Sequence, residues 1–210
     1  MDSGDLFFVA TDPSEGVPLS DKSFRHAPPW FKLDLLRQVA GALQTLHEFG
    51  LLYPSLRTDS IVVVDGSTAK LLDVFEANPS SSVNPYTAPE VAAGAPRSPR
   101  SDVFALGVIA YELLCDTLPF IGTTEAELAH AILSTHPAPP SSVGVLGMDE
   151  LIAKSLAKDP DERYESAAEF LAALPALASA SPPQPIPLQP VPPAQRPLPE
   201  LEEPFDVWDD

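Results

Sequence analysis

The longest apolar pattern in the chain runs over residues 101–115. After Asp102 it carries no charge until Glu112, and the residues between them are apolar on every side of a helical projection. A helix that is apolar all round must be buried, and this stretch is too short and too charged to cross a bilayer. It predicts a central core helix, in which Asp102 at the start accepts backbone N–H groups of the first turn.

Apolar residues spaced three and four apart predict further helices around this core. The longest covers residues 31–49 and ends at Gly50, and shorter ones cover 124–133, 148–156 and 166–174. Thr124 and Glu127 form a capping pair for the helix at 124–133, as Ser166 and Glu169 do for the helix at 166–174. The helix at 124–133 is expected to bury Ala126, Leu128, Ala129 and Ile132.

Two short apolar runs, residues 61–64 and 69–72, flank an Asp65-Gly66 turn and predict a two-stranded hairpin. A third run of strand type, residues 6–9, has nothing upstream to pair with. Residues 76–100 are rich in Ser, Pro and Asn and are expected to form a loop that leads into the central helix.

Composition narrows the class of protein. The chain has 210 residues, of which 44% are hydrophobic, so one domain with a sizeable core is expected. A formal charge of −18 argues against nucleic acid and against an anionic membrane surface as partners. The single cysteine, Cys115, suits a reducing compartment, and residues 1–5 lack the character of a signal peptide. We expect a cytoplasmic protein.

The C-terminal segment differs from the rest. Ten of the 26 prolines lie between Pro182 and Pro204, which excludes helix and inner strand. Residues 176–210 are therefore expected to be a disordered, acidic tail. It is either a solvated spacer or a docking peptide for a protein partner, the latter suggested by Phe205 and Trp208 among six acidic residues in 200–210.

Five motifs occur in an order and spacing that resembles the eukaryotic-type Ser/Thr protein kinase family. They are residues 46–61 at the catalytic loop, 70–75 at the D-F-G element, Tyr86-Thr87-Ala88-Pro89-Glu90 at A-P-E, the helix from Asp102, and residues 158–163. The resemblance covers about residues 6–174 and implies a mainly α fold. That fold is a kinase-like C-terminal lobe with a short two-stranded β element, with the N-terminal lobe largely absent.

The architectural residues of the family are present. The resemblance implies that Glu90 and Arg163 form a largely buried ion pair and that Asp102 holds the backbone of the catalytic loop. Both roles are structural, so they indicate that the fold is kept and say nothing of turnover.

The catalytic positions depart from the family. Where kinases have H-R-D, this chain has Tyr53, Pro54 and Ser55. A hydroxyl carries no negative charge at neutral pH, so Ser55 cannot replace the carboxylate base. Arg57 stands at the usual lysine and Ser60 at the metal-binding asparagine, where it is a shorter and weaker ligand.

The activation segment is altered as well. Pro54 removes the arginine that would receive a phosphate from Ser80, Ser81 or Ser82. Val83 stands at the threonine that links this segment to the catalytic aspartate.

Asp73 alone remains of the family's metal site. It is either a residual magnesium and nucleotide ligand or a polar turn residue, the second interpretation being favoured. Val62 either faces an adenine or belongs to the core, and His47 is interpreted as a packing residue. No cofactor is expected, with ATP and Mg²⁺ retained only if residual nucleotide binding survives.

These observations predict a hinge-like strand and linker in residues 1–30, a helical lobe in 31–175 and the tail. The favoured function is a catalytically impaired, pseudokinase-type binding or scaffold module that binds protein partners through the helical lobe and the tail. The alternative is a Ser/Thr protein kinase whose N-terminal lobe is missing from this chain or supplied in trans, and a third is a truncated product without function.

Overall fold

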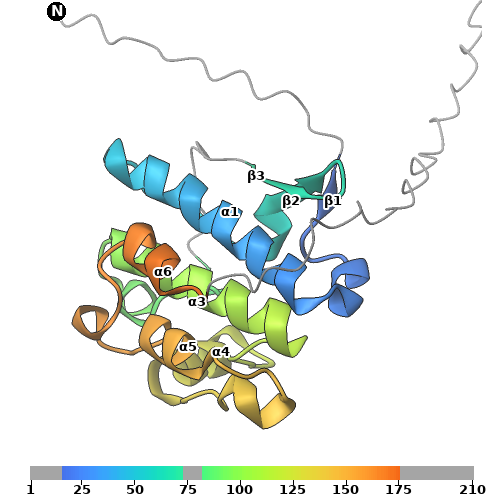
Figure 1. Ribbon diagram of the computed structural model, residues 1–210. Helices are drawn as coiled ribbons and strands as arrows, with labels where there is room; N and C mark the ends of the chain where they lie inside the picture. Colours follow the sequence, from blue (N-terminus) through green and yellow to red (C-terminus); the bar gives the residue numbers. More distant parts are fainter. Residues whose placement is uncertain (1–15, 73–81, 176–210) are drawn as a thin grey trace, which may run out of the picture.

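The computed structural model describes residues 16–72 and 82–175, and Figure 1 shows them as one helical body with a small sheet at one end. The expected strand at 6–9, Asp73 and the tail at 176–210 lie outside the described residues. Within these ranges no helix combines the length and apolar character needed to cross a membrane.

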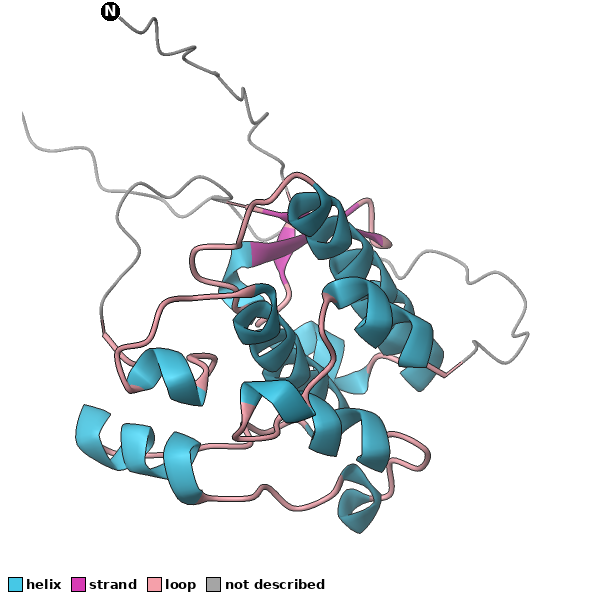
Figure 2. Ribbon diagram, turned by 90° about the vertical axis from the view of Figure 1, so that its left-hand side faces the viewer, coloured by secondary structure: helices cyan, strands magenta, loops and turns pink. Residues whose placement is uncertain are grey.

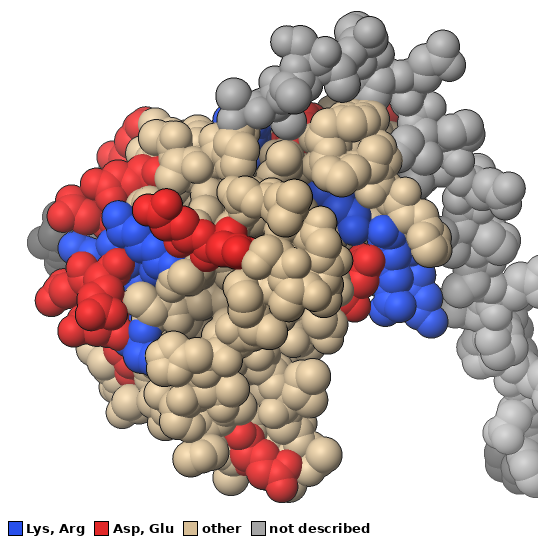
Figure 3. All heavy atoms as spheres, turned by 60° about the horizontal axis from the view of Figure 1, so that its bottom comes forward, with Lys and Arg blue, Asp and Glu red and all other residues tan. Residues whose placement is uncertain are grey.

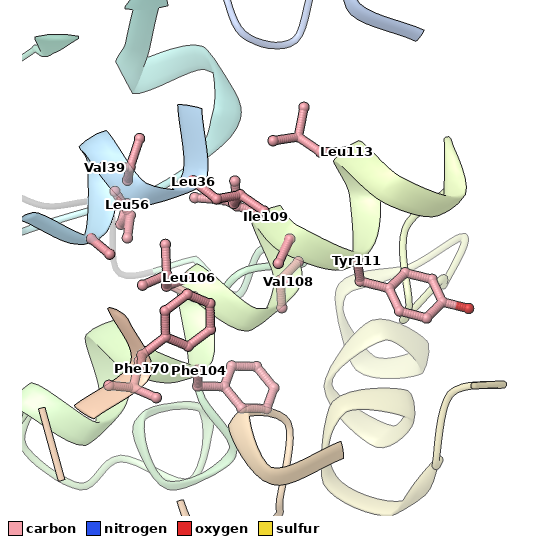
Figure 4. Close-up of a cluster of buried hydrophobic side chains, with 14 of the residues drawn as sticks. Leu36, Val39, Leu56, Phe104, Leu106, Val108, Ile109, Tyr111, Leu113 and Phe170 are labelled. Carbon is pink, nitrogen blue, oxygen red and sulfur yellow. The ribbon is translucent and has the colours of Figure 1, made fainter. Parts of the chain in front are cut away.

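Helix α3, Pro99–Cys115, is the centre of the lobe. Every residue from Ser101 to Leu114 except Glu112 is buried, as the apolar pattern predicts. In Figure 4, Leu106 and Ile109 on this helix face Leu36 and Val39, which belong to helix α1. The core is thus built outward from α3.

The start of α3 differs from the expectation. The helix begins at Pro99, and Ser98 caps it through a reciprocal pair of hydrogen bonds with Ser101. Proline suits the first position because its missing N–H has no intrahelical partner there. Asp102 therefore lies inside the first turn, and the prediction that it caps its own helix is wrong.

Helix α1, Pro29–Glu48, packs across α3 and buries Leu35, Leu36, Val39 and Leu43 completely. It ends before Gly50, whose positive φ of 70° ends the helix where the sequence predicts. Figure 1 shows α1 between the sheet and α6.

The sheet has three antiparallel strands in the order β1-β2-β3, not two as expected. Strands β2, Ile61–Val64, and β3, Thr68–Leu71, form the predicted hairpin, with positive φ at Asp65 and Gly66. Strand β1, Val17–Pro18, adds to β2. Two residues with a proline give no strand pattern, and only pairing to an edge makes them a strand.

Residues that precede α1 also enter the core. Helix η1, Lys22–His26, buries Phe24, and Leu19 before it is buried too. Both belong to the same core cluster as α1 and α3. The packed lobe therefore includes residues from the segment expected as hinge and linker.

Four short helical elements lie between the longer helices and strands of the lobe. They are η2 (Thr58–Ser60), α2 (Pro89–Ala92), η3 (Pro140–Val143) and η4 (Pro160–Glu162). Helix α2 lies in the segment expected as loop, because four residues are too few to show a helical period. Figure 2 shows the strands gathered at one end and helices filling the rest of the lobe.

Helices α5, Asp149–Ser155, and α6, Ala167–Ala173, complete the core where the sequence predicts them. A Cβ on Gly107 of α3 would lie 2.6 Å from Ser155 Cβ, so only glycine allows α3 and α5 to approach so closely.

Helix α4, Glu125–Ser134, is peripheral. Thr124 caps it as predicted, accepting from Glu127 N at 3.2 Å. Of the four residues expected to be buried, only Ile132 is; Leu128 and Ala129 are half-buried and Ala126 is exposed. The amphipathic pattern is correct, but the lobe covers only part of the apolar face.

Candidate functional site: the degenerate catalytic loop

Asp102 anchors the backbone of the catalytic-loop segment. Its Oδ2 accepts from the backbone N–H of Tyr53 at 3.0 Å and lies 2.9 Å from His47 Nε2. Asp102 is 1% exposed, so both contacts are shielded from water. This is the role that the family resemblance implies for Asp102. His47, interpreted from the sequence as a packing residue and not an acid or base, is largely buried and also makes this polar contact.

Tyr53 fixes the other side of the loop. Its ring is buried, and its hydroxyl donates to the carbonyl of Leu72 at the end of β3. Arg97 Nη1 donates to the carbonyl of Tyr53 at 3.4 Å. The loop is therefore tied to α1, α3 and the sheet even though its catalytic side chains differ from the family pattern.

Ser60 does not fit a metal ligand. It is 7% exposed, and its hydroxyl accepts from Arg57 N at 3.1 Å and donates to Arg57 O at 2.8 Å. Both bonds stay within the loop, so the hydroxyl braces the backbone that carries Arg57. Metal binding by Ser60 would require breaking this pair of hydrogen bonds.

Ser55 lies where the family's base would stand. It is half-buried beside a narrow cavity whose described lining also includes Asn84, Thr87 and Arg97, and no carboxylate. A carboxylate is what would accept a proton from a substrate hydroxyl. Arg57 is exposed, and Asp59, two residues along the same loop, is exposed as well.

Val62 points away from the helical core. Its neighbours Ile61 and Val63 belong to the core cluster, and alternate residues of a strand face opposite sides. Val62 is nevertheless buried, at 5% exposed, with Gly16 close to it. Val62 is thus a buried hydrophobic residue, as the core interpretation expects, but on the face of the sheet opposite to Ile61 and Val63.

A polar cluster that the sequence analysis missed joins three elements beside the loop. Tyr86 donates to Glu112 Oε2 at 2.6 Å, and its hydroxyl lies 2.9 Å from Thr58 Oγ1. Burial raises the pKa of the Glu112 carboxyl. Burial also raises the pKa of the Tyr86 hydroxyl, and the hydrogen bond to Glu112 adds to this rise. The signal for this cluster in the sequence was Glu112, a carboxylate in an otherwise apolar helix.

Glu90 and Arg163 anchor the A-P-E segment. Arg163 donates to both carboxylate oxygens of Glu90, at 2.8 Å and 2.7 Å, and Ser101 donates a third bond at 2.8 Å. Arg163 is 2% exposed. Burial opposes ionisation of Glu90, but the bonds from Arg163 and Ser101 outweigh it and lower the pKa of the carboxyl. The pairing implied by the resemblance is present.

Among the described residues, no group of three or more His, Cys, Asp or Glu side chains is placed to hold a metal ion. Asp73, interpreted from the sequence as a polar turn residue or, less favoured, a residual magnesium ligand, lies outside these residues, as do Ser80 and Ser81. Val83 is half-buried, and its N–H donates to Glu125 Oε1 at 2.8 Å.

Known sequences resemble this chain. The family model described as the protein kinase domain matches residues 25–173. The serine/threonine-protein kinase PknB of Mycobacterium leprae is 29% identical over 199 residues, covering 87% of this chain and 32% of that protein. The chain thus spans about a third of that curated relative.

Two further relatives have similar descriptions. A protein of Corynebacterium efficiens named serine/threonine-protein kinases drp72 is 31% identical, over 85% of this chain and 37% of its own length. The serine/threonine-protein kinase Pkn1 of Myxococcus xanthus is 34% identical, over 76% of this chain and 26% of its own length.

Proposed function

The chain belongs to the protein kinase domain family, and we propose that it is a catalytically impaired member acting as a binding or scaffold module. The observation that carries the proposal is the chemistry of two side chains in the catalytic-loop segment. Ser55 offers no carboxylate, and Ser60 commits its hydroxyl to the backbone of Arg57. Phosphoryl transfer needs a base and metal ligands at these two positions.

The architecture supports a binding role. The bonds that hold the loop and the A-P-E segment, centred on Asp102 and on the Glu90–Arg163 pair, shape the lobe without contributing to chemistry. A chain that keeps these buried anchors presents a defined surface. We infer that this surface is what the protein uses.

The surface proposed for protein partners lies along α4. Ile121 is 70% exposed and Leu133 45% exposed. A mostly apolar groove runs beside Ile121, Gly122, Ala126 and Ala131, and its lining also includes Glu127 and His130. Figure 3 brings this end of the lobe forward and shows a broad area without Lys, Arg, Asp or Glu. Apolar surface of this kind commonly marks a protein interaction site. The tail at 176–210 is the second proposed contact.

Phosphate-transfer measurements test the impaired catalysis. The purified chain is incubated with labelled ATP and Mg²⁺, with itself and a basic protein as acceptors, beside an Asp73→Ala control. We expect no transfer above the background of that control. Steady transfer that Asp73→Ala abolishes would overturn the proposal.

The alternative, a Ser/Thr kinase completed by another segment, draws support from the names of the relatives. Thermal melting with and without millimolar ATP and Mg²⁺ separates the two, because a ligand that binds the folded state raises its stability. We expect an unchanged melting temperature. A magnesium-dependent rise would favour the alternative.

The docking surface has its own test. Ile121→Asp places a charge in the groove, whereas Val143→Asp alters another exposed apolar residue, 61% exposed, away from the groove lining. A partner cross-linked to the wild-type chain should be lost with Ile121→Asp and kept with Val143→Asp. Equal loss with both variants would contradict a specific α4 surface.

A further inference from the structure

Strand β3 forms one edge of the sheet, because the order of the described strands is β1-β2-β3 and β3 pairs with β2 alone among them. Leu72, directly after β3, donates to the Ser60 carbonyl on the β2 side. Since backbone groups alternate along a strand, Ala69 directs its N–H and C=O to the opposite side. Thr68 and Lys70 are exposed, so this edge lies at the surface. Such an edge is a template for pairing with another strand.

The side chain of Gln38, on helix α1, occupies part of this edge. Its Oε1 accepts from the Ala69 N–H at 2.8 Å, and its Nε2 donates to the Ser67 carbonyl at 2.9 Å. A side-chain amide offers an acceptor and a donor, as the backbone of an added strand does. Gln38 therefore takes two backbone groups that a further strand would use.

The orientation of the Gln38 amide is fixed by its three partners. Its Nε2 also donates to Asp34 Oδ2 at 2.9 Å, one turn earlier on α1. Exchanging the nitrogen and the oxygen would set a donor against the Ala69 N–H, and an acceptor against the Asp34 carboxylate. The amide is thus held in the orientation that closes the edge of β3.

The same edge, without Gln38, fits the β3 edge of a second copy of this chain. Two β3 strands that pair antiparallel about a two-fold axis at Ala69 exchange hydrogen bonds between the two Ala69 residues. In this register Lys70 lies opposite Thr68 of the second copy, so the two lysines do not face each other and repel. The edge is therefore compatible with itself in hydrogen bonding and in charge.

We propose that Gln38 closes an interface between copies of this chain, by blocking the pairing of β3 with β3 of a second copy. Loss of the Gln38 bonds opens the edge, and two three-stranded sheets join into one across the two-fold axis. The proposal depends neither on the catalytic state of the loop nor on the α4 surface.

The test is the oligomeric state of the full chain carrying Gln38→Ala, measured by sedimentation over a range of concentrations. Gln44→Ala is the matched control, because Gln44 is half-buried on the same helix and its bond to Glu48 Oε1, at 2.8 Å, stays within α1. We expect Gln38→Ala to add a step of self-association that the wild-type chain and Gln44→Ala lack. If Gln38→Ala associates no more than Gln44→Ala, the proposal is wrong.

A second variant, Gln38→Glu, separates the opening of the edge from a general loss of stability. Glutamate sets a second carboxylate beside Asp34 and the Ser67 carbonyl, which weakens the tie between α1 and the sheet. Its charge still opposes strand pairing at the edge. We expect a lower melting temperature than that of the wild type, without the added association. Association equal to that of Gln38→Ala would show that destabilisation is the cause and would overturn the proposal.

Hydrogen exchange at the Ala69 amide locates the interface. In dilute Gln38→Ala this proton should exchange about ten times faster than in the wild type, because one hydrogen bond is lost. At higher concentration the exchange should slow again, since the second copy supplies an acceptor. Exchange at Ala69 that stays fast while dimers form would contradict an interface at β3.

Discussion

The anchors beneath the catalytic loop and the catalytic positions on it differ in kind. Arg163 with Glu90, and Asp102 with Tyr53 and His47, form short bonds away from water. Ser55 is half-buried, Arg57 is exposed, and the hydroxyl of Ser60 bonds only to the backbone of its own loop. Buried charges must be paired for the lobe to fold, whereas exposed catalytic side chains are free of that constraint. The difference explains how a kinase lobe persists when its catalytic residues change.

The largest expected effect is at the Glu90–Arg163 pair. Glu90→Gln leaves Arg163 buried without a counter-charge, which should lower the free energy of unfolding by about 3–5 kcal/mol. Glu165→Gln is the matched control, because Glu165 is 73% exposed and pairs with Arg100 at 3.5 Å. It should cost less than about 1 kcal/mol. Equal losses in urea unfolding would remove the distinction between anchors and surface pairs.

The second effect is at Asp102. Asp102→Ala removes the acceptor of the Tyr53 N–H and the partner of His47, and should cost about 1.5–3 kcal/mol, the range for hydrogen bonds to charged groups. Asp149→Ala removes a similar bond to the Ser141 N–H, but at the surface. Urea unfolding of the two variants compares them. A loss at Asp102 no larger than that at Asp149 would contradict its role as an anchor.

The third prediction compares the free energy of unfolding after substitutions at Ser60 and at Ser55. Ser60→Ala loses the brace on Arg57 and should cost about 0.5–1.5 kcal/mol. Ser55→Asp, at a half-buried position, should change the free energy of unfolding by less than about 0.5 kcal/mol. If Ser55→Asp is the more destabilising change, Ser55 has a structural role that its surroundings do not indicate.

A further effect is a pH dependence from Lys158. Its folded pKa of about 8 lies below the unfolded value of 10.5, so the unfolded chain binds more protons between these two pH values. Stability should therefore rise with pH across this window, relative to Lys158→Met. Chemical unfolding at pH 7.5, 9 and 10.5 checks the sign. A difference that does not change with pH would mean that the amine has an ordinary pKa.

Much of the fold could be predicted because its apolar pattern is strong. The core helix, the 31–49 helix and the hairpin follow from periodicity and from Asp65-Gly66, and each is present near its expected bounds. The two-residue strand β1 and the four-residue helix α2 are too short to show a period. Neither could be predicted, because their conformation comes from what they pack against.

The sequence by itself determined which chemical groups the site holds: serines at the base and metal positions, and the Glu90, Asp102 and Arg163 side chains of the family. Only the tertiary structure decided what those groups do. It showed that Asp102 does not cap its own helix and gave it His47 as a partner besides the loop backbone that the resemblance implies. It also brought Tyr86, Thr58 and Glu112 together. It also placed Lys158 against Ile132 and Phe120. The physical reason is that composition fixes the chemistry of each group, whereas pKa and hydrogen-bond partners depend on burial and on neighbours distant in the chain.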